Sequence, residues 1–138
     1  RNHSSAASDV YKRQAKTRGD KEIVAWGDGS PTREFLYVED CAEGILLAAE
    51  RYNQSEPVNL GSSYEISIKE LMETIARATN FVGEIAWDTS KPNGQPRRKL
   101  EVERAKIAFG FESHVEFEEG LAKTIAWYEK NIGLPVVP

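Results

Sequence analysis

The sequence has little cysteine, little histidine and no long apolar run. Its one cysteine, Cys41, cannot close a disulfide within the chain, so we expect a reducing, cytoplasmic setting. The two histidines, His3 and His114, have no second ligand at a useful spacing, and a metal site is not expected. No apolar run approaches the roughly 18–20 residues that a membrane span needs, so we expect no membrane partner.

The chain also lacks an excess of basic residues. Lys and Arg number 18 against 22 Asp and Glu, and the net charge is −4. Domains that bind nucleic acid are usually basic overall, so this balance argues against a nucleic-acid partner. A composition of 40% hydrophobic and 29% charged residues is typical of a globular protein, and 138 residues correspond to about one domain.

Two motifs needed for hydride transfer by enzymes of the short-chain type are missing. No G-x-G-x-x-G turn follows a predicted strand, so the chain has no dinucleotide-binding start. None of the five tyrosines is followed by a lysine four positions later. We therefore expect no catalytic residue within this chain and no turnover by the chain alone.

The two ends of the chain differ in composition from the rest. Residues 1–14 are polar, rich in Ser and Ala, and without an apolar period, so we expect a non-native or disordered leader there. We expect an incomplete domain over residues 15–134 and a tail over 135–138.

The pattern of apolar residues predicts alternating strands and helices. Strands are predicted over residues 23–26, 33–38, 57–61 and 84–87. Helices are predicted from Asp40, over 68–79, over 103–109 and from Phe117. This alternation indicates an α/β fold, although four short strands are few for a self-contained open sheet.

Two helix starts carry capping signals. Ser67 with Glu70 is the clearest capping box in the chain, and Asp40 with Glu43 fits the same spacing. Behind Asp40, the predicted apolar face contains Cys41, Ile45, Ala48, Ala49 and Tyr52. On that face, we expect Cys41 to be a buried structural thiol and not a nucleophile.

Residues 26–40 contain the first two candidate ligand contacts. Trp26 ends an apolar strand, where an indole can stack on a base or serve as ordinary core. Arg33 follows a Gly/Ser/Pro turn, where a guanidinium can hold a diphosphate through two hydrogen bonds. The alternative for Arg33 is a surface arginine paired with Glu34 or Asp28.

A second cluster of candidates follows the last predicted strand. The cations Lys91, Arg97, Arg98 and Lys99 flank a loop rich in Pro, Gly and Asn, and they form either an anion site or a solvated basic turn. Asp88 either accepts hydrogen bonds from sugar hydroxyls or caps the loop that it precedes.

Residues 26–40, WGDGSPTREFLYVED, resemble the G-x-G…T-R-x-F-x-x-V-x-D signature of the extended short-chain dehydrogenases/reductases. This family comprises the NAD(P)-dependent sugar-nucleotide epimerases and dehydratases. The segments VNLG at 58–61, EISIKEL at 65–71 and WDTSKPNGQPRRKL at 87–100 resemble its GDP-L-fucose synthase branch. The resemblance covers residues 16–131.

The resemblance implies that the chain is the C-terminal substrate-binding part of such an enzyme, with a remnant of the Rossmann sheet. Trp26, Arg33 and Asp88 match substrate-binding positions, and Lys91 and Arg97 lie in the matching loop. The implied partner is a GDP-sugar, and the implied cofactor is NADP, held by an N-terminal domain of the intact enzyme. That enzyme is expected to be a homodimer. A fragment of another sugar-nucleotide epimerase/dehydratase and a non-catalytic binding module are the alternatives.

Overall fold

The computed structural model describes residues 21–132, and these residues form two compact units. Within the described residues, the first unit contains 21–32 and 66–97, and the second contains 33–65 and 98–132. The leader predicted over residues 1–14 and the tail predicted over 135–138 lie outside the described residues. The domain predicted over residues 15–134 stays a prediction.

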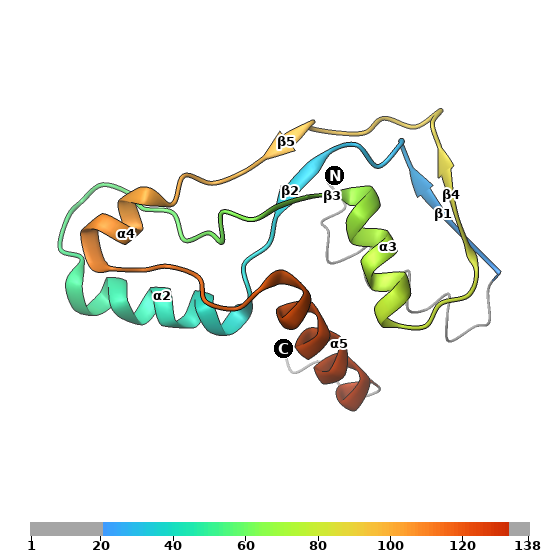
Figure 1. The fold of residues 1–138 in the computed structure, drawn as a ribbon. Coiled ribbons are helices and arrows are strands. Elements are labelled where there is room, and N and C mark those ends of the chain that lie inside the picture. The colour runs from blue at the N-terminus through green and yellow to red at the C-terminus, as the bar shows by residue number, and fades with distance from the viewer. Residues whose placement is uncertain (1–20, 133–138) are drawn as a thin grey trace. The chain divides into compact units, whose positions relative to one another are not determined.

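In residues 21–32 and 66–97, the first unit contains two parallel strands and one helix. Strands β1 (Glu22–Trp26) and β4 (Glu84–Asp88) pair in parallel, and helix α3 (Ile68–Ala78) precedes β4 in the chain (Figure 1). Parallel neighbours need a long connection, and the segment that contains α3 supplies it. The strands predicted over 23–26 and 84–87 are confirmed.

Helix α3 begins and packs as its sequence predicts. The Ser67 hydroxyl accepts the Glu70 N–H at 3.1 Å, and the Glu70 carboxylate accepts the Ser67 N–H at 3.1 Å. One face of the helix is buried, where Leu71, Met72 and Ile75 are no more than 4% exposed. The predicted capping box and apolar face are both confirmed.

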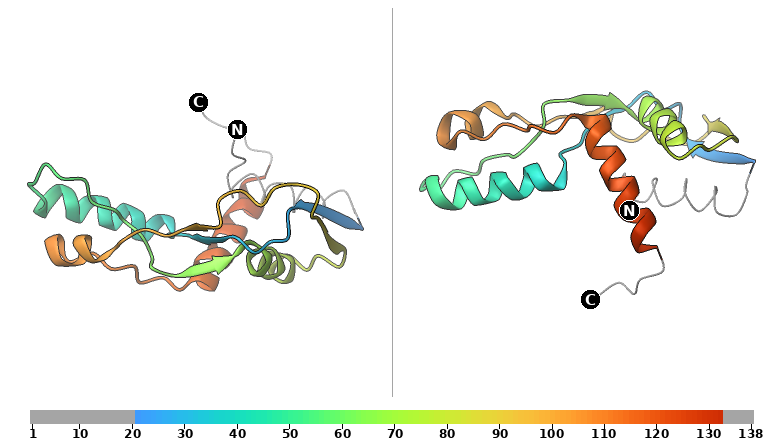
Figure 2. Two further views of the ribbon diagram at one scale, coloured as in Figure 1. Left: turned by 90° about the horizontal axis from the view of Figure 1, so that it is seen from above. Right: turned by 60° about the horizontal axis from the view of Figure 1, so that its bottom comes forward.

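The second unit contains three helices, α2 (Val38–Arg51), α4 (Glu103–Phe109) and α5 (Phe117–Asn131). Helices α2 and α4 lie side by side (Figure 2). The core consists of residues from α4 and the segment after it, with partly buried side chains from α2 and residues 58–60 packed against it. Its fully buried members are Ala105, Phe109 and Phe111. Gly110 ends α4 in the left-handed conformation, at φ 79°, as predicted.

Three further strands are very short. They are β2 (Thr32–Glu34), β3 (Glu65–Ser67) and β5 (Arg97–Arg98), and they pair in the order β3-β2-β5. Each of them contains a point at which the chain passes from one unit to the other. The sequence predicted neither β3 nor β5.

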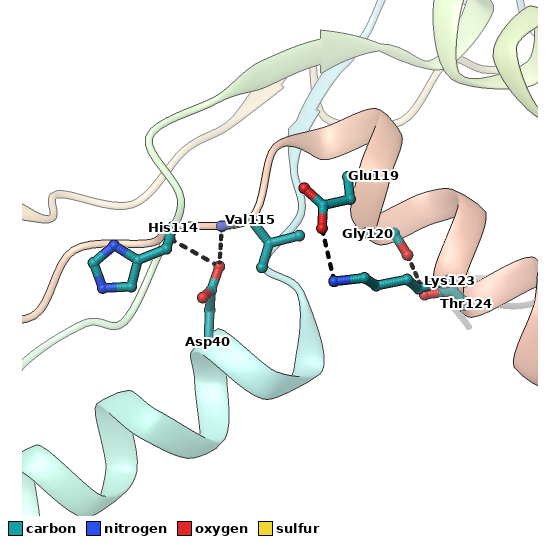
Figure 3. Close-up of polar contacts among 7 residues, drawn as sticks. All are labelled: Asp40, His114, Val115, Glu119, Gly120, Lys123 and Thr124. Carbon is teal, nitrogen blue, oxygen red and sulfur yellow. Dashed lines mark hydrogen bonds and ion pairs between the residues drawn. The ribbon is translucent and has the colours of Figure 1, made fainter.

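The region before α2 differs from the prediction. The strand predicted over 33–38 ends at Glu34, and the helix begins at Val38, before Asp40. Asp40 is therefore inside the first turn and is not the N-cap. Its carboxylate accepts the N–H groups of His114, at 3.1 Å, and Val115, at 3.0 Å (Figure 3). These partners are more than 70 residues away in sequence, so spacing along the chain cannot reveal them.

Two other local predictions are wrong. Residues 57–61 form no strand, and Leu60 packs against the core from an irregular segment. On α2 the side chains that pack on the core are Leu47, Ala48 and Tyr52, whereas Ile45 is 57% exposed. The buried face is thus rotated from the predicted one, and Cys41 is only half-buried.

Candidate functional site

Trp26 and Asp88 lie next to each other at the ends of two parallel strands. They are register partners in β1 and β4, and the Gly27 N–H donates to the Asp88 carbonyl at 2.9 Å. Parallel strands present their carboxyl ends at one edge, which is where α/β proteins commonly bind ligands. The Trp26 side chain is 62% exposed at this edge.

Lys91 joins this pair from the loop after β4. Its Nζ lies 5.9 Å from the centroid of the Trp26 ring, within the range of a cation–π interaction. Its backbone N–H donates to the Asp88 carbonyl at 3.1 Å. The structure therefore brings together Trp26, Asp88 and Lys91, three of the five predicted site residues.

The Asp88 carboxylate caps the loop that it precedes. Its Oδ1 accepts the Ser90 hydroxyl at 2.5 Å and the Ser90 N–H at 3.1 Å. The hydrogen bond from the Ser90 hydroxyl is the main cause that lowers the pKa of Asp88, with smaller contributions from the Ser90 N–H and the charge of Lys91. The group is therefore ionised at neutral pH, and its remaining lone pairs can accept hydrogen bonds from hydroxyls.

The turn after β1 is held by its own polar groups and by Asn93. The Asp28 carboxylate accepts the Ser30 N–H at 2.9 Å, and hydrogen bonds from Ser30 are the main cause that lowers the pKa of Asp28. The Asp28 N–H donates to Oδ1 of Asn93 at 2.8 Å. Sequence reasoning missed the role of Asn93, because composition marks residues 88–96 as a loop but does not say which distant segment its amide contacts.

The other two predicted residues occupy the short strands. Arg33 is half-buried in β2 and is the first residue of the second unit. Arg97 is exposed in β5 and is the last residue of the first unit. That Arg33 and Arg97 share a site with Trp26 stays a prediction.

Glu34, beside Arg33, has a role that the sequence did not reveal. Its carboxylate accepts the N–H of Ser62 at 2.8 Å and the N–H of Leu100 at 3.2 Å. A Cβ at Gly61 would collide with the same carboxylate, so the backbone approaches it closely there. Glu34 thus joins three segments of the second unit immediately after Arg33.

The described residues give no sign of a metal centre or a membrane span. Between residues 21 and 132, no three His, Cys, Asp or Glu side chains are placed to hold a metal ion. His114 lies near one carboxylate, with Nε2 at 3.8 Å from Oε1 of Glu43. None of the helices in this range is long and apolar enough to cross a bilayer.

One family model and several curated relatives match the chain. The profile of the NAD dependent epimerase/dehydratase family matches residues 1–61. GDP-L-fucose synthase 1 of Arabidopsis thaliana is 41% identical over 120 residues, which are 86% of this chain and 36% of that protein. UDP-glucuronic acid decarboxylase 1 of Xenopus tropicalis is 37% identical over 112 residues, which are 81% of this chain and 26% of that protein.

A solved structure extends the likeness to the fold. The crystal structure of a GDP-L-fucose synthetase from Naegleria fowleri bound to NADP matches with a TM-score of 0.85 at 29% identity. The match covers 93% of this chain and 40% of that one. The chain thus spans only part of the length of these curated relatives, 36% of the Arabidopsis protein and 26% of the Xenopus protein.

Proposed function

We propose, on the premise that this chain belongs to the NAD dependent epimerase/dehydratase family, that it is the nucleotide-sugar-binding portion of a GDP-L-fucose synthase. Such an enzyme is a GDP-4-keto-6-deoxy-mannose 3,5-epimerase/4-reductase. The observation that carries the proposal is the gathering of Trp26, Asp88 and Lys91 at the carboxyl ends of β1 and β4.

Each of these groups suits one part of a sugar nucleotide. The exposed indole of Trp26 offers a flat apolar face on which a base can stack. Lys91 supplies positive charge beside it, and the proposal adds Arg33 and Arg97 as further partners of the diphosphate. The ionised Asp88 accepts hydrogen bonds from sugar hydroxyls.

The cofactor of the family does not fit the residues of this chain. The glycine-containing turn after β1, residues 27–31, leads into strand β2, whereas a dinucleotide site needs such a turn to open a helix. In the intact enzyme, NADPH would supply hydride for the reduction of the keto-sugar. We assign that chemistry, and NADP binding, to the N-terminal Rossmann domain of the intact enzyme.

A ligand titration tests the proposal. The full chain is titrated with GDP, GDP-mannose, UDP and UDP-glucose while tryptophan fluorescence and the melting temperature are recorded. We expect the guanosine ligands to quench fluorescence and to raise the melting temperature, because a ligand that binds only the folded state stabilises it. A preference for the uridine ligands would reject the assignment to GDP-sugars.

The second candidate is a portion of an enzyme acting on a UDP-sugar. The 37% identity to UDP-glucuronic acid decarboxylase 1 favours it, since that value is close to the 41% of the GDP-L-fucose synthase. The same titration separates the two candidates. A chain that binds neither class of nucleotide would instead support a binding module for another partner.

We also expect the chain alone not to oxidise NADPH. It carries neither a Gly-rich nucleotide turn nor a tyrosine and lysine at the spacing that reduction requires. The measurement is NADPH absorbance in the presence of the chain and a GDP-keto-sugar, and sustained turnover would refute this part of the proposal.

A further inference from the structure

The loop that carries Lys91 is irregular and exposed. Residues 89–96 are all exposed and contain neither helix nor strand. At the start of the loop the Lys91 N–H donates to the Asp88 carbonyl, and at its end the Pro96 carbonyl accepts the Thr32 N–H at 2.9 Å. A contact between these two ties helps to offset the conformational entropy that the loop loses when it is ordered.

Asn93 supplies this contact and reaches the turn that follows Trp26. Its Oδ1 accepts the Asp28 N–H at 2.8 Å. Its side chain also contributes, after Ser30, to the lowered pKa of Asp28. The Asn93 carboxamide therefore ties the loop to the turn at Asp28.

Gly27 leaves the space that Asn93 occupies. Its φ is +81°, and a Cβ built there would collide with Oδ1 of Asn93 and lie 3.1 Å from its Cγ. Gly94, one residue beyond Asn93, has a similar φ of +80° but no atom within 4 Å of its Cβ position. Alanine at either glycine would strain the backbone, but only alanine at Gly27 would also collide with Asn93. Comparing the two variants therefore separates the two effects.

We infer that Asn93 is a positioning residue for the proposed sugar-nucleotide site. It fixes the loop two residues after Lys91 to the turn two residues after Trp26, and so sets how the Lys91 ammonium lies against the indole. The nucleotide then meets a cation and a ring at a preset separation, and less of its binding energy is lost to ordering the loop. This role rests on the proposed function, because the ligand is taken from it.

The first test needs no ligand. Amide hydrogen exchange of Asp28 is measured by NMR in the full chain and in the variants Asn93→Ala, Asn93→Asp and Gly94→Ala. We expect Asn93→Ala to speed exchange about three- to tenfold, the size of one net hydrogen bond. Asn93→Asp keeps an acceptor oxygen but sets a second carboxylate beside that of Asp28, so it should protect the Asp28 amide less than asparagine does. Gly94→Ala strains the backbone without touching Asn93, so it measures how much strain in the loop alone speeds exchange.

The second test separates positioning from a merely structural role. Affinity for GDP-mannose is measured for Lys91→Ala, Asn93→Ala and the double variant. Asn93→Ala should weaken binding about three- to tenfold, and the double variant should bind no more weakly than Lys91→Ala alone. Gly27→Ala should resemble Asn93→Ala because its Cβ displaces that side chain, whereas Gly94→Ala should not.

Three results would overturn the inference. Additive losses in the double variant would show that Asn93 acts independently of Lys91. Unchanged exchange of the Asp28 amide in Asn93→Ala would show that Asn93 does not hold the turn. Absence of GDP-mannose binding by the parent chain would remove the proposed function itself, and the exchange data would show separately whether the Asn93 contact exists.

Discussion

At the scale of single residues, two exposed tryptophans test whether the proposed site binds the ligand. One lies in the site and the other lies outside it. Trp26 is 62% exposed in the first unit, and Trp127 is 66% exposed on α5 of the second. We expect Trp26→Ala to weaken GDP-mannose binding roughly five- to hundredfold, the range of one base–aromatic stack. Trp127→Ala is the matched control and should leave the dissociation constant unchanged, as measured by calorimetry. Equal losses in both variants would contradict the site.

Two glycines give a prediction about stability. Gly29 has φ +76°, and a Cβ there would lie 2.5 Å from Cη2 of Trp87 and 2.8 Å from Cβ of Lys69. Gly94→Ala should cost only the backbone strain, about 1–2 kcal/mol. Gly29→Ala should cost about 1–3 kcal/mol more, because it also overpacks the space beside Trp87. Urea unfolding midpoints measure the stability of both variants. Equal destabilisation would show that the Trp87 side chain can move aside without loss of stability.

Residue types and strand ends marked Trp26 and Asp88 as candidates but left ordinary core and loop capping open, and the family resemblance was needed to select them, together with Lys91, as a site. A tryptophan and an aspartate at the ends of predicted strands become neighbours as soon as those strands pair in parallel. Asn93 was missed because its partner, the Asp28 N–H, is 65 residues away. Contacts of a loop amide depend on tertiary placement, which spacing along a chain does not encode.

At the scale of elements, the capping box of α3 makes stability depend on pH. Hydrogen bonds from the Ser67 hydroxyl and N–H lower the pKa of Glu70. A carboxyl whose pKa is lowered on folding stabilises the fold above its unfolded pKa, about 4.3, and this contribution is lost as pH falls through the folded value. Between about pH 6 and pH 3, the unfolding midpoint should therefore fall less for Glu70→Gln than for the parent chain.

The control for this prediction lies on the same helix. Glu73→Gln removes an exposed carboxylate outside the box and should keep the pH dependence of the parent chain. Ser67→Ala should destabilise by about 1 kcal/mol at neutral pH, as the loss of an N-cap usually does. If the unfolding midpoint falls equally with pH in the parent chain and in Glu70→Gln, protonation of the capping box is not coupled to folding.

Asp40 anchors the segment before α5 to the first turn of α2. It is 3% exposed and accepts two backbone N–H groups, from His114 and Val115 (Figure 3). Asp40→Ala leaves those donors without their acceptor and should destabilise the chain by about 2–3 kcal/mol in urea unfolding. Glu39→Ala, an exposed carboxylate in the same turn, should change stability by less than about 0.5 kcal/mol. A small effect of Asp40→Ala would mean that water replaces the carboxylate.

Helices with strong local signals were predictable, and elements decided by distant contacts were not. Helix α3 has a capping box, α4 ends at a glycine, and α5 was predicted to begin at Phe117; all three lie where predicted. The start of α2 was placed wrongly because Asp40 and Glu43 have the spacing of a capping box. The Asp40 carboxylate instead accepts the backbone N–H groups of His114 and Val115. Residues 57–61 look like a strand, yet their apolar side chains pack on helix α4 without a pairing partner.

At the scale of the whole molecule, the α/β fold class was predictable from the alternation of strands and helices. The division of the chain into two units was not predictable. The chain passes between two units within β2, β3 and β5, strands of two or three residues that carry little periodic signal. Several large apolar side chains, among them Leu46, Val82 and Ile107, are more than two-thirds exposed. Apolar area that stays in water does not stabilise the fold. We therefore expect the isolated chain to be marginally stable, and a sharp two-state melt at high temperature would contradict this.

The central claim is that Trp26, Asp88 and Lys91 bind a sugar nucleotide at the carboxyl ends of β1 and β4. The most direct measurement is a ¹H–¹⁵N NMR titration of the full chain with GDP-mannose, including the indole N–H signals of Trp26 and Trp127. The account predicts shifts concentrated in residues 26–31 and 88–96, with the Trp26 indole responding and the Trp127 indole unchanged. Shifts confined to α4 and α5, or a response of Trp127 without Trp26, would contradict it.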